Sequence, residues 1–200
     1  MKESQDHVQL WQKFIQGDRD AFTAIYNTYI GNLHEYAMRI LKDQEQVEDC
    51  LHDLFTKLWA NHKTLGHTDN IKFYLIAALR NNIISFRTRE SRFQKEELRD
   101  HEAFVLEFDA EANRIKNEES SEQSKKIKAA LDQLTGRQKE ILYLKYFEEL
   151  DYEQISELMN ISVKGAYKLS ARALEGLRAI MNVDKATVIL MLFHYRSQLF

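Results

Sequence analysis

The chain contains no proline in 200 residues and only six glycines. Strand-rich folds connect many short strands through turns that rely on these two residue types, so their scarcity favours long helices joined by polar loops. Because 44% of the residues are hydrophobic, the chain can bury a core, and disorder throughout is excluded. We therefore expect an all-α fold.

Apolar residues in the first half recur with helical spacing. Over residues 22–41, and again over 47–59, they fall three or four positions apart, as in an amphipathic helix. The two stripes are expected to pack together. After a polar loop at 61–70, Asp69 is predicted to be the N-cap of a third helix over 71–89.

The second half carries local signals for short helices. Thr135 to Gln138 and Asp151 to Gln154 both have the form of a capping box, in which the first and fourth residues bond each other's backbone. Asn160 to Ser162 then supplies a tight turn and an N-cap before a basic helix that runs from Val163 to Met181. Two helices joined by such a turn predict a helix-turn-helix.

These patterns divide the chain into two small helical domains. The first is predicted over residues 6–92 and the second over 124–182. Between them, residues 93–123 are acidic and lack a sustained apolar period, as in a linker. Residues 183–200 form an apolar tail, which we expect to pack on the second domain or to meet a partner.

The net charge of −3 argues, taken alone, against a nucleic-acid-binding protein. Its distribution points the other way, because the cations gather in two clusters with a single acid in each. The clusters are Arg80, Arg87, Arg89, Arg92 and Lys95, and Lys164, Lys168, Arg172 and Arg178. Two basic surfaces separated by an acidic connector are compatible with DNA binding.

Each basic cluster has a functional and a plain structural interpretation. The helix from Val163 could enter a major groove with Lys164, Lys168 and Arg172 facing DNA, or it could be an ordinary solvated helix. In the first domain, Phe73 and Tyr74 interleave with cations, which suits the stacking of single-stranded bases. The same two rings could instead belong to a core.

Signals for other classes of protein are weak. The single cysteine, Cys50, falls on a buried stripe, no zinc-ligand spacing is present, and no phosphate loop or nucleophile elbow appears, so neither a metal site, a cofactor nor an enzyme is predicted. The N-terminal segment lacks the apolar core of a signal peptide, and the apolar run from Ala186 to Phe193 is far shorter than the roughly 20 residues that span a bilayer. We expect a cytoplasmic protein without membrane insertion.

Four blocks of the sequence resemble the extracytoplasmic-function sigma factors of bacterial RNA polymerase. The blocks are Gln46 to Trp59, Tyr74 to Asn81, Leu134 to Gln138 and Asp151 to Arg178. Their order and spacing, with an acidic linker between the second and third, make the combination specific. The resemblance implies an alternative sigma factor that binds the β′ and β subunits of core RNA polymerase and promoter DNA. It also implies an anti-sigma factor, membrane-anchored or free, as a partner.

The resemblance assigns three groups of contact residues. Those implied to bind core polymerase are Glu48, Asp49, Asp53, Leu54 and Phe55. Those implied to capture melted bases of the −10 element are Lys63, Phe73, Tyr74, Arg80, Asn81, Arg87 and Arg89. Those implied to read the −35 element as duplex are Ser162, Lys164, Gly165, Tyr167, Lys168, Ser170 and Arg172.

The sequence departs from the family pattern at several of these positions. Many relatives have Thr at Gly165, a basic residue at Tyr167, Asp near Ser85 and Trp at Tyr74. Two alternative functions follow from the residues alone. One is an autonomous helix-turn-helix regulator of duplex operators, and the other is a helical scaffold that does not bind DNA.

Overall fold

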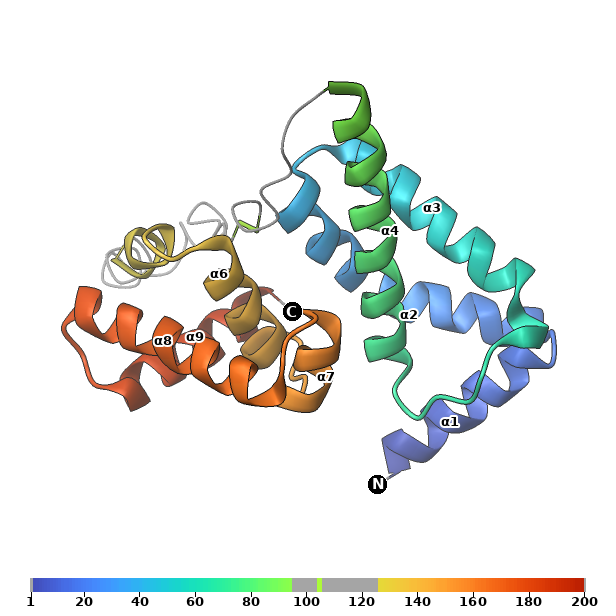
Figure 1. The fold of residues 1–200 in the computed structure, drawn as a ribbon. Helices are drawn as coiled ribbons and strands as arrows, with labels where there is room; N and C mark the ends of the chain where they lie inside the picture. The colour runs from blue at the N-terminus through green and yellow to red at the C-terminus, as the bar shows by residue number, and fades with distance from the viewer. Residues whose placement is uncertain (1, 95–103, 106–125, 200) are drawn as a thin grey trace. The chain divides into compact units, whose positions relative to one another are not determined.

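The computed structural model describes residues 2–94, 104–105 and 126–199. All regular secondary structure in these ranges is helical, which confirms the all-α prediction (Figure 1). The chain divides into two compact units, Met1–Leu98 and Arg99–Phe200. Each unit is a separate helical assembly.

Over residues 2–94, the first unit contains four α-helices and a short 3₁₀ helix. They are α1 (Lys2–Ile15), α2 (Arg19–Leu41), α3 (Gln44–Ala60), η1 (His62–Thr64) and α4 (Ile71–Gln94). Helices α2, α3 and α4 pack against one another, and α1 packs on α2. The predicted packing of the two first stripes is confirmed, and their buried residues, such as Ile25 and Leu58, form the core.

Side-chain caps fix where these helices begin. Asp18 accepts hydrogen bonds from the amides of Asp20 and Ala21 at the start of α2, and Asp43 accepts one from the amide of Gln46 at the start of α3. The prediction of Asp69 as the cap of α4 is wrong by one residue. Asn70 occupies that place, because its Oδ1 accepts from the amide of Phe73 at 2.9 Å.

In the described part of the second unit, residues 126–132 are helical. The unit continues with α6 (Gly136–Leu142), the π-helix η2 (Tyr143–Phe147), α7 (Tyr152–Leu158), α8 (Val163–Met181) and α9 (Lys185–Leu199). Both predicted capping boxes are present, at Thr135 with Gln138 and at Asp151 with Gln154. Local sequence therefore determines the starts of α6 and α7.

The apolar tail is the helix α9, which packs on α8 and η2. Val188 and Leu192 are fully buried, and the ring of Phe193 meets that of Tyr146 edge-on at 5.8 Å. Arg196 also forms an ion pair with Glu149. The prediction that the tail packs on the second domain is confirmed.

The predicted linker over 93–123 lies largely outside the described residues, and so does the cation Lys95. Within it, Phe104 is buried, with its ring 5.5 Å from that of Tyr143 in the second unit. No helix in the described ranges is long and apolar enough to cross a membrane. The same ranges contain no group of three or more side chains that could hold a metal ion.

Candidate functional site

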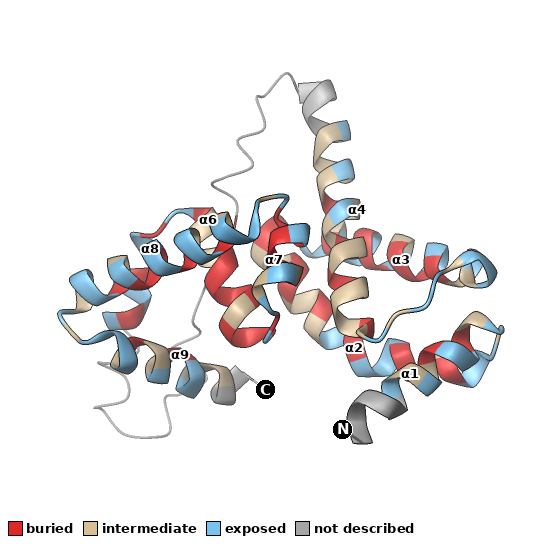
Figure 2. Ribbon diagram, turned by 60° about the horizontal axis from the view of Figure 1, so that its bottom comes forward, coloured by how far each residue is buried: buried red, intermediate tan, exposed pale blue. Residues whose placement is uncertain are grey.

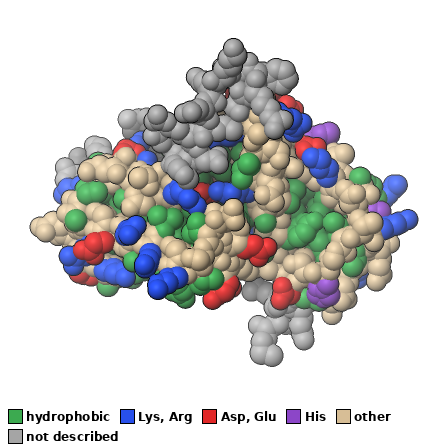
Figure 3. Space-filling view, in the orientation of Figure 1, with side chains coloured by type: hydrophobic (Ala, Val, Ile, Leu, Met, Phe, Trp, Pro, Cys, Tyr) green, Lys and Arg blue, Asp and Glu red, His purple; other side chains and the backbone are tan. Residues whose placement is uncertain are grey.

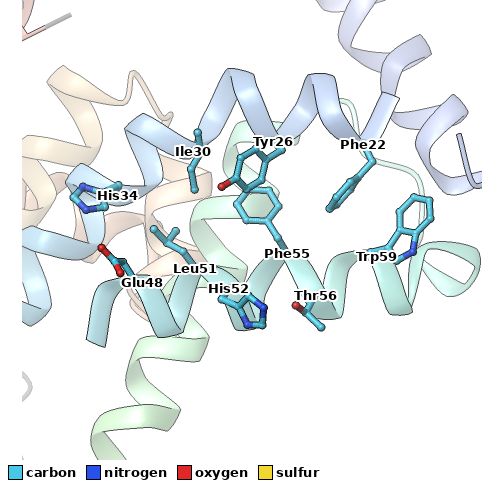
Figure 4. Close-up of a pocket in the computed structure, with 10 residues that line it drawn as sticks. All are labelled: Phe22, Tyr26, Ile30, His34, Glu48, Leu51, His52, Phe55, Thr56 and Trp59. Atoms are coloured by element: carbon cyan, nitrogen blue, oxygen red, sulfur yellow. The ribbon is translucent and has the colours of Figure 1, made fainter. Parts of the chain in front are cut away.

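An open groove of about 570 Å³ runs between α2 and α3 in the first unit (Figure 4). Aromatic and aliphatic side chains from both helices form its floor, and polar side chains stand at its edges. The lining residues are Phe22, Tyr26, Ile30, His34, Glu48, Leu51, His52, Phe55, Thr56 and Trp59. A partly exposed apolar surface of this kind is typical of a protein-binding site.

The groove is built from ring pairs that join the two helices. The ring of Tyr26 meets that of Phe55 edge-on at 4.7 Å, and the ring of Phe22 lies 5.1 Å from that of Trp59. Tyr26 is nevertheless 40% exposed, although it is a large aromatic side chain. His34 and Glu48 lie at one end of the groove, and Trp59 lies at the other (Figure 4). The floor is therefore packed by ring contacts between the two helices and remains partly accessible.

The residues implied to bind core polymerase divide between three faces of α3. Glu48 and Phe55 line the groove. Asp49 and Asp53 lie on the neighbouring face, because each helical residue turns the chain by about 100°; Asp53 there accepts a hydrogen bond from Lys57 at 2.6 Å. Leu54 is only 3% exposed and does not line the groove, so its prediction as a surface contact is wrong. Phe55 is 5% exposed, so it offers the groove only a small part of its ring.

The loop over residues 61–70 connects α3 to α4. Lys63 is exposed on it, as a DNA-contacting cation must be. Phe73 and Tyr74 follow in the first turn of α4 and are half-buried, so each ring serves both the core and the surface. The ring of Tyr74 lies 4.9 Å from that of Trp11, and burial raises the pKa of its phenol, which keeps it neutral.

The remaining −10 residues lie further along α4. Asn81 and Arg89 are exposed, and Arg80 is half-buried. Arg87 donates a hydrogen bond to the carbonyl of Ile40 at the C-terminal end of α2. That nitrogen of Arg87 is committed to holding α2 against α4, where a cation also offsets the negative end of the helix dipole. Its prediction as a plain DNA contact therefore missed a structural role.

Helices α7 and α8 form the predicted helix-turn-helix in the second unit. Asn160 adopts a left-handed conformation (φ 51°) in the turn between them, which asparagine tolerates better than most residues. Ser162 caps α8 by accepting a hydrogen bond from the amide of Gly165 at 3.0 Å. A Cβ at Gly165 would lie 3.1 Å from the Ser162 hydroxyl, so a larger residue there would crowd the cap.

Helix α8 has a buried and an exposed side (Figure 2). Its buried residues are Ala166, Ser170, Ala173, Leu174 and Leu177. On the other side Lys164, Lys168 and Arg172 are all exposed, and Lys and Arg side chains gather over this helix in Figure 3. The helix is therefore amphipathic in the way that a major-groove recognition helix requires.

Two residues of α8 contact Tyr152 of the preceding helix, and one of them departs from what the sequence indicated. Ser170 is 1% exposed and hydrogen-bonds to the hydroxyl of Tyr152 at 3.0 Å, so it joins α7 to α8 and its prediction as a DNA contact is wrong. Tyr167 is 53% exposed, and its ring lies 3.9 Å from that of Tyr152. Tyr152, which sequence reasoning missed, supports both residues from the preceding helix.

Comparison with protein families matches both units. Residues 25–93 match the sigma-70 region 2 model, and residues 124–177 match the sigma-70 region 4 model. Together these matches cover more than half of the chain.

Individual relatives agree with these matches. The chain is 26% identical over 163 residues to the ECF RNA polymerase sigma factor SigM of Bacillus subtilis, covering 79% of this chain and 93% of that protein. It is 21% identical over 173 residues to SigX of the same organism, covering 82% and 85%.

Among solved structures, the sigma factor RpoE of Bartonella quintana, crystallised with the anti-sigma factor NepR, superposes with a TM-score of 0.57 at 20% identity. The match covers 82% of this chain and 98% of that one, and it concerns the fold. The two matched regions, in the order that the sequence blocks predicted, show that the chain belongs to the sigma-70 family, in its extracytoplasmic-function group.

Proposed function

We propose that this alternative sigma factor binds core RNA polymerase through the α2–α3 groove and starts transcription from selected promoters. The open apolar groove of region 2 carries the proposal, because Tyr26 is 40% exposed there beside Phe55, and a contiguous exposed apolar patch marks an interaction surface. An apolar groove between two helices suits a helical partner. The coiled coil of the β′ subunit is the partner that the family resemblance implies.

The second unit would read the −35 element as duplex DNA. Lys164, Lys168 and Arg172 are exposed on one side of α8, where they can reach phosphates or the acceptor edges of guanine. Tyr167 is held by Tyr152, so its ring can meet a thymine methyl group with little loss of side-chain freedom. The buried face of α8 fixes the register of these side chains.

The first unit would capture unstacked bases of the −10 element. The exposed cation Lys63 on the loop can meet the DNA backbone, while the half-buried ring of Tyr74 offers a stacking surface. Asn81 lies about two turns further along α4 than Tyr74, and its amide provides donors and an acceptor for a base edge. Single-stranded bases present both a π-face and free hydrogen-bonding edges, and this arrangement suits both.

The modest overall charge is consistent with a protein that binds promoter DNA together with core polymerase. With a net charge of −3, the free protein has little long-range attraction for DNA, so core polymerase would supply most of the affinity. The protein would act in the cytoplasm as a non-catalytic subunit. By analogy with the complex of RpoE and NepR, we also propose regulation by an anti-sigma factor.

The docking proposal is tested by two threonine substitutions. Thr56 lines the groove and is exposed, so Thr56→Arg places a long cation over the apolar floor. Thr28 is exposed on α2, half a turn or more from the groove residue Tyr26, so Thr28→Arg is the matched control. Capture of core polymerase should be lost with the first variant and retained with the second.

A third variant separates the groove from the neighbouring acidic face. Asp49→Arg/Asp53→Arg reverses two charges of α3 that lie outside the groove lining. Loss of core binding in this variant as well would extend the interface over both faces. Retention of core binding by Thr56→Arg would refute the groove as the docking site.

A further inference from the structure

Trp11 lies on α1, ahead of the region 2 match that begins at residue 25. Its side chain is fully buried, and its indole Nε1 donates a hydrogen bond to the carbonyl of Gly66 at 2.9 Å. Gly66 is in the loop over residues 61–70, far from Trp11 in the sequence. The N-terminal helix is therefore tied directly to the loop that the proposed function places on the −10 element.

The same indole also contacts the other half of the proposed −10 site. Its ring lies 4.9 Å from that of Tyr74, in the first turn of α4, at an interplanar angle of 60°. Phe14 holds the indole from the α1 side, with a ring separation of 5.1 Å. One buried side chain thus touches both the loop and the helix that the loop leads into.

A second contact secures the beginning of the loop. Gly17, in the turn after α1, has a φ of +92°, and a Cβ there would lie 3.2 Å from Nε2 of His62. The ring of His62 stacks on Trp59 at 5.0 Å, and its Nδ1 lies 2.6 Å from the Trp59 carbonyl oxygen. The first residues of the loop are therefore packed, and the Trp11 bond fixes its middle.

We propose that Trp11 is a positioning residue, which holds the loop over residues 61–70 and Tyr74 in the arrangement that captures unstacked −10 bases. The proposal rests on the proposed function of that loop. A flexible loop would lose conformational entropy each time it bound DNA, and this cost would weaken the affinity for the −10 bases. The Trp11 hydrogen bond moves this cost to the folding of the sigma factor.

Two changes at Trp11 test the role of its N–H group. Trp11→Phe removes the donor and part of the ring, whereas benzothienylalanine at this position removes the donor and keeps the bicyclic shape. Leu33→Val is the control, because Leu33 is also buried in the core of the first unit, on α2, and its substitution disturbs packing without altering the residues around Trp11 or the bond to Gly66. All variants are made in the full chain and assembled with core polymerase.

Three measurements separate positioning from general destabilisation. The first is trypsin cleavage after Lys63, which is exposed in the loop and reports its anchoring without DNA. The second is the affinity of the holoenzyme for a single-stranded −10 oligonucleotide, taken from a promoter that the wild-type protein selects from a random library. The third is the affinity for a duplex that carries the −35 element alone.

We expect both Trp11 variants to be cleaved faster and to bind the single strand about threefold to tenfold more weakly, which is the value of one hydrogen bond. Binding of core polymerase and of the −35 duplex should be unchanged, and Leu33→Val should leave single-strand affinity near that of wild type. Unchanged single-strand affinity in the benzothienylalanine protein, or an equal loss in Leu33→Val, would overturn the proposal. Failure of the wild-type holoenzyme to bind any −10 strand would instead refute the proposed function, while the cleavage assay would still report whether Trp11 anchors the loop.

Discussion

The contribution of α9 to the second unit can be measured with two leucines that lie on the same helix. Leu192 is fully buried against the rest of the unit, whereas Leu190 is 68% exposed. Replacing a buried leucine with alanine removes its transfer free energy and leaves a cavity, at a cost of about 3 kcal/mol. An exposed leucine loses neither, so Leu190→Ala should change the unfolding free energy by less than about 0.5 kcal/mol.

The expected loss in Leu192→Ala is large for a domain of this size. A domain of 60–100 residues loses roughly 4–8 °C of melting temperature for each kcal/mol, so the second unit should melt about 12 to 24 °C lower. Both tryptophans, Trp11 and Trp59, lie in the first unit, so tryptophan fluorescence follows that unit alone. Far-UV circular dichroism follows both units.

The two signals together make the result decisive. Melting of the second unit is the transition seen by dichroism and not by fluorescence. In Leu192→Ala this transition should move to lower temperature, while the fluorescence transition of the first unit stays in place. Equal melting of Leu192→Ala and Leu190→Ala would refute the packing of α9 on the second unit. A shift of the fluorescence transition would show that α9 stabilises the first unit, which would also refute its packing on the second unit.

Three further outcomes follow from the structure. Burial, reinforced by the carboxylate of Asp53, raises the pKa of the Cys50 thiol, so less thiolate is present at about pH 8. Ellman's reagent should therefore react with the folded chain far more slowly than with the urea-unfolded chain, and equal reaction rates would contradict this prediction. Lys168→Glu/Arg172→Glu should weaken holoenzyme binding to a −35 duplex and lower its salt slope by about two, with core binding unchanged, as measured by fluorescence anisotropy at several salt concentrations. Ser162→Ala removes the α8 cap and should cost about 1 kcal/mol of second-unit stability in the dichroism assay, and no change would show that the cap is replaced by water.

The features that were predictable from sequence depend on neighbours within a few residues. Both capping boxes and the Ser162 cap connect groups three residues apart, so a single sequence contains all the required information. The stripes of α2 and α3 were visible because their apolar residues repeat over several turns. The cap of α4 was misplaced by one residue, because Asp69 and Asn70 are both good caps and only the backbone selects between them.

The features that were missed depend on contacts between distant residues. Ser170 is polar and was expected at the surface, but the hydroxyl of Tyr152, 18 residues earlier, satisfies it inside the unit. Leu54 and Phe55 are adjacent apolar residues, and only the position of α2 decides that Phe55 lines the groove. No local pattern could connect Trp11 to Gly66 across 55 residues.

If this chain directs core RNA polymerase to particular promoters, run-off transcription from a random promoter library will show it. The reaction is run with core polymerase alone, with the wild-type protein and with Thr56→Arg. We expect transcripts from a defined set of promoters only with the wild-type protein. A wild-type protein that leaves core polymerase inactive, and binds duplex operators tightly by itself, would instead be an autonomous helix-turn-helix regulator and not a sigma factor.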